Sequence, residues 1–308
     1  MSSQIEGTQA SLIDVLEAAN DEDVHADPRG VREVVNYVDA MSYGIERLTT
    51  LPLSLRLLRE IHEVLLSGTR GSERAPGEFR KLQNWIGPEG CNLNNATFVP
   101  PPVPVMHSAL SDLEKYFHTE DSYSLPLVTI GLIHAQFETI HPFLDGNGRM
   151  GRLLVTFWLC QQNILSRPLL YLSHYFKLHR QEYYDRLMNV RMKGDWEGWI
   201  RFFLTGIAEV SLEATETAKS ILKLRDEQLS HLKKSSVSAK ALRLYELLYE
   251  HPVITVNRAK DLLDVTFPTA NSILNNFSDM GILEPMNPTA QRNRSYIFHR
   301  YVKLMDPD

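Results

Sequence analysis

The sequence predicts a mainly α-helical protein with one large and one small domain. Apolar residues recur at helical spacing on both sides of residues 141–152, and no strand–helix–strand alternation surrounds them. A Ser-rich stretch at 235–238 follows a long polar-faced helix. At 308 residues the chain can hold two domains, which we place at 1–234 and 235–308.

Composition and charge exclude several classes of protein. Hydrophobic residues make up 43% of the chain and charged residues 23%, which is ordinary for a soluble globular protein. The net charge of −6 argues against a chain-wide electrostatic grip on nucleic acid or anionic lipid. Two cysteines, Cys91 and Cys160, make no disulfide framework. No signal peptide is visible and the longest apolar run, 153–160, is too short to cross a bilayer, so we expect a cytoplasmic protein without membrane partners.

Helices are expected along most of the first domain. Five segments have apolar residues at helical spacing or in continuous runs: 31–47, 53–66, 105–117, 125–140 and 149–164. The first is expected to follow a turn at Asp27-Pro-Arg-Gly30. Another helix starts near Trp196, and a long polar-faced helix is expected from Ile207 to about Lys234.

Residues 141–152 gather six types of functional residue between two apolar helices. Their sequence is His141-Pro-Phe-Leu-Asp145-Gly146-Asn147-Gly148-Arg149-Met-Gly-Arg152. Pro142 disfavours helical geometry at His141, so the first helix is expected to end there and present the imidazole at its edge. Two glycines allow positive φ, which lets consecutive N–H groups converge on an anion beside the free N–H groups of the second helix.

The side chains of this stretch suit a polyphosphate. Arg149 and Arg152 lie on neighbouring positions of one helix turn and can bind phosphate oxygens. Asp145 suits a hard cation such as Mg²⁺ that bridges phosphates, and His141 supplies a base that titrates near neutral pH. The stretch lacks the Lys-[Ser/Thr] end of a P-loop. It therefore predicts a different kind of site, at which a hydroxyl attacks a nucleotide phosphate.

The stretch resembles the signature of the Fic (filamentation induced by cAMP) family, His-Pro-Phe-x-[Asp/Glu]-Gly-Asn-Gly-Arg-x-x-Arg, at every specified position. Members mostly transfer AMP from ATP to a hydroxyl of a target protein, so the resemblance implies a Fic helical core and a protein adenylyltransferase that uses ATP and Mg²⁺. It implies that His141 deprotonates the target hydroxyl and that Asp145 holds Mg²⁺ on the α- and β-phosphates. The remaining positions would bind the nucleotide: Gly146, Asn147 and Gly148 as the anion hole, Arg149 at the phosphates, and Arg152 at the γ-phosphate.

The N-terminal segment Ser2-Ser-Gln-Ile-Glu6-Gly7 is similar to the autoinhibitory motif of Fic proteins, [Ser/Thr]-x-x-x-Glu-[Gly/Asn]. In that family the glutamate pairs with the second arginine of the signature, here Arg152, and blocks the γ-phosphate. A carboxylate can form a bidentate pair with a guanidinium. The resemblance therefore implies an enzyme inhibited by Glu6 with Ser2. Because relatives usually carry a helical segment upstream of this motif, one hypothesis is that the natural chain starts before Met1.

Residues Leu82, Trp85 and Ile86 lie between proline and glycine stops, which favours a short β-hairpin at about 79–88. In Fic proteins a flap at this place covers the signature and aligns the target by strand addition. The resemblance implies that four flap residues border the nucleotide: Asn84, Trp85, Ile86 and Gly87.

Aromatic residues after the signature are candidates for the adenine pocket. In Fic proteins a tyrosine pair lines that pocket, which implies Tyr183 and Tyr184 for ring stacking and hydrogen bonding. Trp196 is a further candidate for contact with the nucleotide, whereas Trp199 is expected in the core.

The second domain resembles a winged helix-turn-helix. Helices are expected at Ala239–Tyr249, Val256–Leu263 and Thr269–Met280, followed by a β-wing formed by Ile282–Pro285 and Arg294–His299. Residues 236–308 carry eight Lys or Arg and eight Asp or Glu, and the candidate recognition helix has no basic residue. Phosphate contacts normally dominate DNA affinity, and only Arg292 and Arg294 on the wing are available. DNA binding therefore stays open but is not favoured over dimerisation, target recruitment or an architectural role.

Three functions compete. The first is AMP transfer to a Ser, Thr or Tyr hydroxyl of an unidentified target protein, or of the enzyme itself, restrained by Glu6. The second keeps the site but uses another nucleotide or a phosphocholine donor, or removes AMP with the inhibitory glutamate positioning water; Gly146-Asn147-Gly148 and Arg152 favour a triphosphate donor instead. The third is a DNA-binding regulator whose nucleotide pocket is a sensor. The sequence leaves the target and the oligomeric state open, although the family often dimerises and a homodimer is one option.

Overall fold

The computed structural model is mainly α-helical, as the sequence predicts. It describes residues 5, 12–18, 28–69, 71–88, 90–119, 125–168, 170–235, 237–286 and 294–305. The chain forms two compact units, of which the first comprises Met1–Gln9 and Pro28–Leu212 and the second Ala10–Asp27 and Glu213–Asp308. Helix α9 (Trp196–Lys234) contributes to both units. The functional division after residue 234 stays a prediction.

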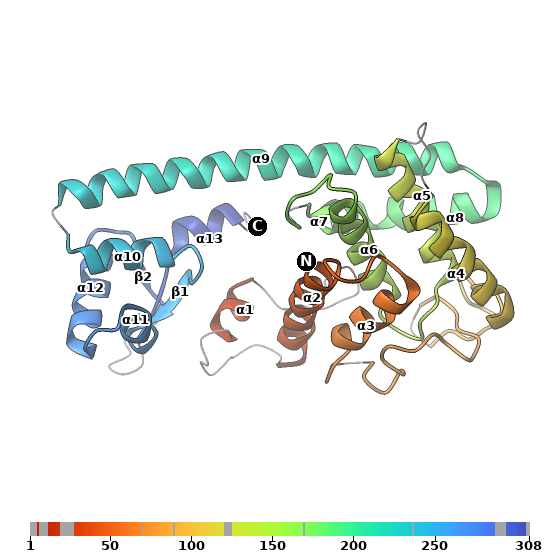
Figure 1. Cartoon of the computed structure of the whole chain (residues 1–308), viewed down its shortest axis with the longest axis horizontal. Coiled ribbons are helices and arrows are strands. Elements are labelled where there is room, and N and C mark those ends of the chain that lie inside the picture. Colours follow the sequence, from red (N-terminus) through yellow and green to blue (C-terminus); the bar gives the residue numbers. More distant parts are fainter. Residues whose placement is uncertain are drawn as a thin grey trace. The chain divides into compact units, whose positions relative to one another are not determined.

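The first unit is a helical assembly (Figure 1). Its helices are α2 (Pro28–Arg47), α3 (Leu55–Leu65), α4 (Val103–Phe117), α5 (Pro126–Ile140), α6 (Asn147–Gln161), α7 (Leu172–Leu178), α8 (Arg180–Lys193) and the first part of α9. A non-helical turn was expected at residues 27–30, but α2 already begins at Pro28, because proline is favoured at the start of a helix. The two helices expected from Trp196 and Ile207 are one continuous helix of 39 residues.

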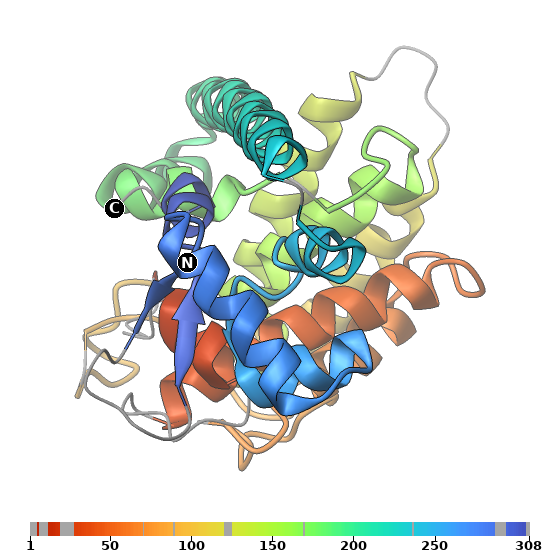
Figure 2. The same cartoon turned by 90° about the vertical axis from the view of Figure 1, so that its left-hand side faces the viewer.

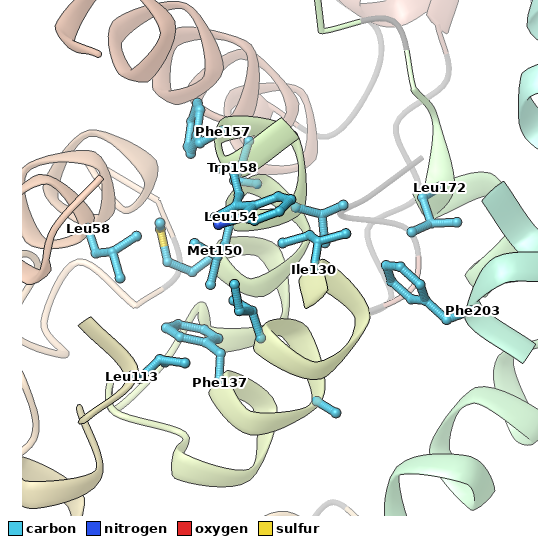
Figure 3. Close-up of a cluster of buried hydrophobic side chains, with 14 of the residues drawn as sticks. Leu58, Leu113, Ile130, Phe137, Met150, Leu154, Phe157, Trp158, Leu172 and Phe203 are labelled. Atoms are coloured by element: carbon cyan, nitrogen blue, oxygen red, sulfur yellow. The ribbon is translucent and has the colours of Figure 1, made fainter. Parts of the chain in front are cut away.

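Close packing of α5 and α6 positions the segment between them. Ile130 and Phe137 of α5 and Met150 and Leu154 of α6 are fully buried in one core, which Figure 3 shows. Gly151 of α6 allows the close approach: a Cβ there would lie only 2.4 Å from Glu138 Oε1 on α5. A larger residue at 151 would therefore require the Glu138 side chain to move.

His134 of α5 is fully buried and contacts a cluster of aromatic rings. Its Nδ1 donates to the carbonyl of Gly151 at 3.0 Å, so Nε2 is the acceptor for the hydroxyl of Tyr183 at 2.9 Å. Trp199 stacks on the imidazole at 5.8 Å and donates its Nε1–H to Gly131, which confirms its predicted place in the core. Burial lowers the pKa of His134 to about 4, so the ring is neutral at pH 7.

The second unit contains short helices, the C-terminal part of α9 and a three-stranded antiparallel sheet of order β1-β3-β2. Figure 2 shows strands of this sheet beside helices of the unit. Its elements are α1 (Leu12–Ala18), the rest of α9, α10 (Ala239–Leu247), β1 (Val253–Thr255), α11 (Val256–Leu263), α12 (Phe267–Asp279), β2 (Glu284–Pro285), β3 (Ser295–Ile297) and α13 (His299–Met305). In the register, Ile297 of β3 pairs with Val253 on one side and with Glu284 on the other. The three expected helices and the paired strands of the wing are present, while β1 and α13 were not expected.

The strands β2 and β3 are shorter than the segments 282–285 and 294–299 that were expected to form the wing. Arg294 precedes β3, whereas Arg292 lies outside the described residues. No helix in the described ranges combines the length and the apolar character that crossing a membrane requires.

Acidification should destabilise the first unit through His134. A buried histidine with a lowered pKa binds a proton more readily in the unfolded chain, so its contribution to stability is full above the unfolded pKa of 6.5 and is lost as the pH falls towards about 4. Between about pH 7 and about pH 5 this residue alone should cost roughly 2 kcal/mol. We expect His134→Gln, which can still donate and accept but cannot titrate, to show a correspondingly smaller loss in urea unfolding at the two pH values. Equal losses in both proteins would contradict this role.

Candidate active site

The helix before the signature ends where the sequence predicts. α5 ends at Ile140, and His141 adopts a left-handed conformation with φ 49° and ψ 61°. Its N–H donates to Phe137 at 2.9 Å. Because Pro142 follows, the chain cannot continue as a helix, and it turns sharply into the segment that leads to α6.

The turn between α5 and α6 is closed by Asn147. The amide of this buried side chain spans the turn: Oδ1 accepts from the N–H of Phe143 and Nδ2 donates to the carbonyl of Phe143, both at 2.8 Å. Gly146 has φ +72°, which a glycine adopts without strain. The signature asparagine thus acts through its side chain on the shape of the turn.

The N-terminus of α6 offers donors to an anion. The first hydrogen bond of the helix joins Met150 N–H to the carbonyl of Gly146. The N–H groups of Asn147 and Gly148 therefore have no acceptor within the helix. Arg149 and Arg152, 4% and 5% exposed, place two buried positive charges on the same helix. Backbone donors, the helix dipole and these charges together favour a polyphosphate.

Asp145 is suited to bind a cation whose other ligands come from a substrate. Its Oδ1 accepts from Gly146 N–H at 2.6 Å and lies 3.7 Å from Arg149 Nη2, and its side chain is 37% exposed. Gly71 faces it with φ +97°, and a Cβ on Gly71 would lie 2.8 Å from Asp145 Oδ2. The described residues contain no group of three His, Cys, Asp or Glu that could hold a metal alone. One accessible carboxylate beside backbone donors that suit phosphate fits Mg²⁺, which is usually held by few protein ligands and substrate phosphates.

His141 differs from the base that the sequence predicts. Burial, together with the positive charge of Arg191, lowers its pKa to about 3. The ring is therefore neutral at pH 7, in the form that accepts a proton, instead of titrating near neutrality. Its Nδ1 is buried and has no hydrogen-bond partner among the described residues.

Two arginines outside the signature, Arg80 and the partly buried Arg191, bind the backbone around His141. Arg80 is 1% exposed; its Nε donates to the carbonyl of His141 at 3.1 Å and its Nη2 to that of Pro101. Arg191 of α8 donates to Glu138 and Thr139 at the end of α5, and its guanidinium lies 3.9 Å from the ring centre of Phe98. Sequence reasoning missed both, because no local pattern marks a single arginine that becomes buried through distant contacts.

The paired segments of the predicted flap extend beyond residues 79–88, as far as Pro100. Ile86 and Phe98 form an antiparallel bridge with N–H···O distances of 2.8 and 3.0 Å, and Gln83 donates to Pro100. Within the described part of this region no strand pairs inside 79–88, so the two arms are joined by a longer loop. Pro88 has no backbone N–H to donate to a second strand, and a Cβ on Gly87 would lie 2.6 Å from Cys91 Sγ.

The flap contacts the signature through one predicted residue. Asn84 Nδ2 donates to Phe143 at 2.9 Å and to His141 at 3.3 Å. Trp85 is 43% exposed and donates its Nε1–H to Cys91. The structure thus brings Asn84 to the signature and leaves the face of Trp85 accessible.

The aromatic candidates occupy different environments. Tyr183 is 2% exposed and its hydroxyl is engaged by His134, so it belongs to the core behind the site. Tyr184 and Trp196 are each 39% exposed. Of the inhibitory segment, Ser2 and Glu6 lie outside the described residues, while Ile5 is fully buried in the core of the first unit.

Two models of one family match this chain. The Fic/DOC family matches residues 52–159, which include the turn and both flanking helices, and the N-terminal part of the Fic/DOC family matches residues 1–46. Together these matches span half of the chain. The chain belongs to the Fic/DOC family.

Curated relatives of this Fic protein are proteins named protein adenylyltransferase Fic. One from Culex quinquefasciatus is 28% identical over 210 residues, which cover 68% of this chain and 36% of the relative. One from Drosophila grimshawi is 28% identical over 181 residues, 58% of this chain and 33% of the relative. The chain thus spans about a third of the length of these relatives.

Solved structures confirm the Fic fold. A Fic family protein from Desulfovibrio desulfuricans G20 matches with a TM-score of 0.61 at 22% identity and covers 96% of this chain and 83% of its own. Fic-1 from C. elegans matches with a TM-score of 0.53 at 20% identity, over 70% of this chain and 62% of its own.

Replacement of Arg80 should weaken the first unit. Arg80→Met keeps the length of the side chain but removes the guanidinium donor from the carbonyl of Pro101 and leaves the carbonyl of His141 with only the amide of Asn84 at 3.3 Å, so the free energy of unfolding should fall by about 3 kcal/mol. Arg56→Met is the matched control: the Arg56 side chain is 71% exposed and pairs with Glu60, and its loss should cost about 0.5 kcal/mol or less. Urea unfolding followed by tryptophan fluorescence measures both, and similar small losses would refute the role given to Arg80.

Proposed function

We propose that this Fic protein is an adenylyltransferase that moves AMP from ATP to a Ser, Thr or Tyr hydroxyl of a protein. One observation carries the proposal: the N-terminus of α6, with N–H groups that lack intrahelical acceptors, begins in a left-handed turn that also presents His141 and Asp145. An anion site, an accessible carboxylate and a neutral imidazole within one turn are the groups that phosphoryl transfer to a hydroxyl requires.

The phosphates of ATP would bind at the start of α6. The N–H groups of Asn147 and Gly148 would donate to them, and Arg149 and Arg152 would neutralise part of their charge. Asp145 would hold Mg²⁺, which supplies charge neutralisation on the phosphates during transfer. The chain contributes donors and charges that are fixed before the substrate binds, because Asn147 and Gly146 define the turn.

His141 would act as the general base. The target hydroxyl oxygen attacks the α-phosphorus, its proton passes to the imidazole, and pyrophosphate leaves as the bond to the β-phosphate breaks. The free ring is a weak base because its pKa is about 3. Bound phosphates nearby would favour the protonated ring and raise that pKa, so the base gains strength when the nucleotide is present.

The nucleoside and the target would lie on either side of the flap. Tyr184 and Trp196 are both partly exposed and would contact the base, Tyr183 packs against Tyr184 from the core, and Ile86 and Gly87 would complete the border. Asn84 ties the flap to the signature, and Trp85 offers an exposed ring. A target segment would align along the flap through backbone hydrogen bonds.

Inhibition would come from Glu6 at Arg152, with Ser2 in support. The burial of Ile5, which precedes Glu6 in the sequence, in the core of the first unit supports this proposal. For the second unit we propose target recruitment or assembly over DNA binding, since α12 carries no lysine or arginine.

Label transfer from α-³²P-ATP with Mg²⁺ tests the proposal. We expect weak self-labelling by the wild type, stronger labelling by Glu6→Gly, and loss by at least a hundredfold when His141→Ala is added. The double variant should still bind ATP, because His141 contributes the base and not the phosphate donors.

Each alternative predicts a different pattern. Strong wild-type labelling unchanged by Glu6→Gly would keep the transferase and refute the inhibition. If every variant binds ATP but labels neither itself nor purified candidate target proteins, the transferase is refuted and a nucleotide sensor is favoured.

A further inference from the structure

His62 is a fully buried histidine on α3, about eighty residues before the signature, and both of its ring nitrogens are engaged. Nδ1 accepts from the N–H of Gly77 at 2.9 Å, and Nε2 lies 3.0 Å from the carbonyl oxygen of Asp145. A carbonyl only accepts and an amide N–H only donates. The ring is therefore held as a single neutral tautomer whose proton is on Nε2 and is donated to Asp145.

The ring also determines the shape of the signature turn by packing. It stacks on Phe143 with ring centres 3.7 Å apart and planes 8° apart. At Gly146 a Cβ would lie 3.4 Å from His62 Nε2, so the imidazole fills the space beside the left-handed residue. His62 thus contacts three residues of the turn, through its face at Phe143 and through its edge at Asp145 and Gly146.

On its other side the ring holds the base of the flap. Gly77 has φ +75° and precedes Glu78, which pairs with Arg59 of α3. Three residues after Gly77, Arg80 donates its backbone N–H to Pro142 at 2.8 Å and its Nε to His141. The flap base therefore reaches the signature by two routes, one direct through Arg80 and one through the imidazole of His62.

We propose that His62 is a positioning residue that couples the base of the flap to the Asp145–Gly146 turn. It touches neither nucleotide nor target; it fixes the carbonyl of Asp145, and with it the direction of the Asp145 carboxylate, relative to the segment that aligns the target. The effect of this coupling on catalysis rests on the proposed function. Its effect on the structure can be tested without any enzymatic activity. Groups behind a metal-binding or phosphate-binding side chain commonly change affinity or activity by about 10–100-fold when removed.

Two variants separate hydrogen bonding from packing. His62→Phe keeps a ring of similar size that can stack on Phe143 but loses both hydrogen bonds. His62→Gln places an amide N–H near the position of Nε2, so it can still donate to Asp145. Leu58→Ala is the control for general loosening, because Leu58 is a fully buried residue of the same helix.

Hydrogen–deuterium exchange of the full chain gives the deciding readout. In His62→Phe we expect faster exchange at 143–148 and at 77–86 together, with α5 and α6 unchanged, and in His62→Gln recovery of protection at 143–148. Leu58→Ala should instead raise exchange throughout the helices. Unchanged exchange in His62→Phe, or a rise spread over the core as in the control, would overturn the proposal.

A binding measurement complements the exchange data. Calorimetry under conditions without AMP transfer measures the Mg²⁺ concentration at which ATP binding is half-saturated. This concentration should rise about tenfold in His62→Phe and return towards the wild-type value in His62→Gln. Equal values in wild type and His62→Phe would overturn the coupling to Asp145. If the wild type transfers no AMP at all, the proposed function fails, yet exchange and binding still decide the role of His62.

Discussion

The turn from His141 to Gly146, whose first and last residues have positive φ, is held in one conformation by contacts from several sides, and the remaining features of the site depend on it. Asn147 closes it from within, Arg80 binds the carbonyl of His141 from the flap, and His62 fills the space beside Gly146. A turn with two residues at positive φ is not stable in isolation. Because surrounding side chains bind backbone atoms of the turn, the donors at the start of α6 are oriented before any ligand arrives.

Burial explains how the proposed site could combine an affinity for anions with a neutral base. Arg149 and Arg152 are buried positive charges, which favours a negatively charged ligand, while desolvation and Arg191 hold His141 unprotonated. The two effects support each other: phosphate binding at the arginines would raise the basicity of the imidazole. The close contact of α5 and α6 at Gly151 makes this arrangement compact.

Local features of the fold could be predicted from the sequence, and features that depend on distant contacts could not. The end of α5 at Ile140, the bounds of α11 and the burial of Trp199 follow from proline chemistry, capping residues and apolar pattern. The bridge from Ile86 to Phe98, the pairing of β1 with β3, the burial of His62 and Arg80 and the hydrogen bonds of Arg191 join segments that lie apart in the sequence. The low pKa of His141 depends on burial and on Arg191, so the residue type alone suggested a different value.

The most direct test of this view is a crystal structure of the Glu6→Gly protein with Mg²⁺ and a non-hydrolysable ATP analogue. The phosphates should lie against the N–H groups of Asn147 and Gly148, with Mg²⁺ on Asp145 and the turn unchanged from its conformation without ligand. A nucleotide bound elsewhere, or a turn that refolds on binding, would contradict the conclusion that the chain preorganises a polyphosphate site at the start of α6.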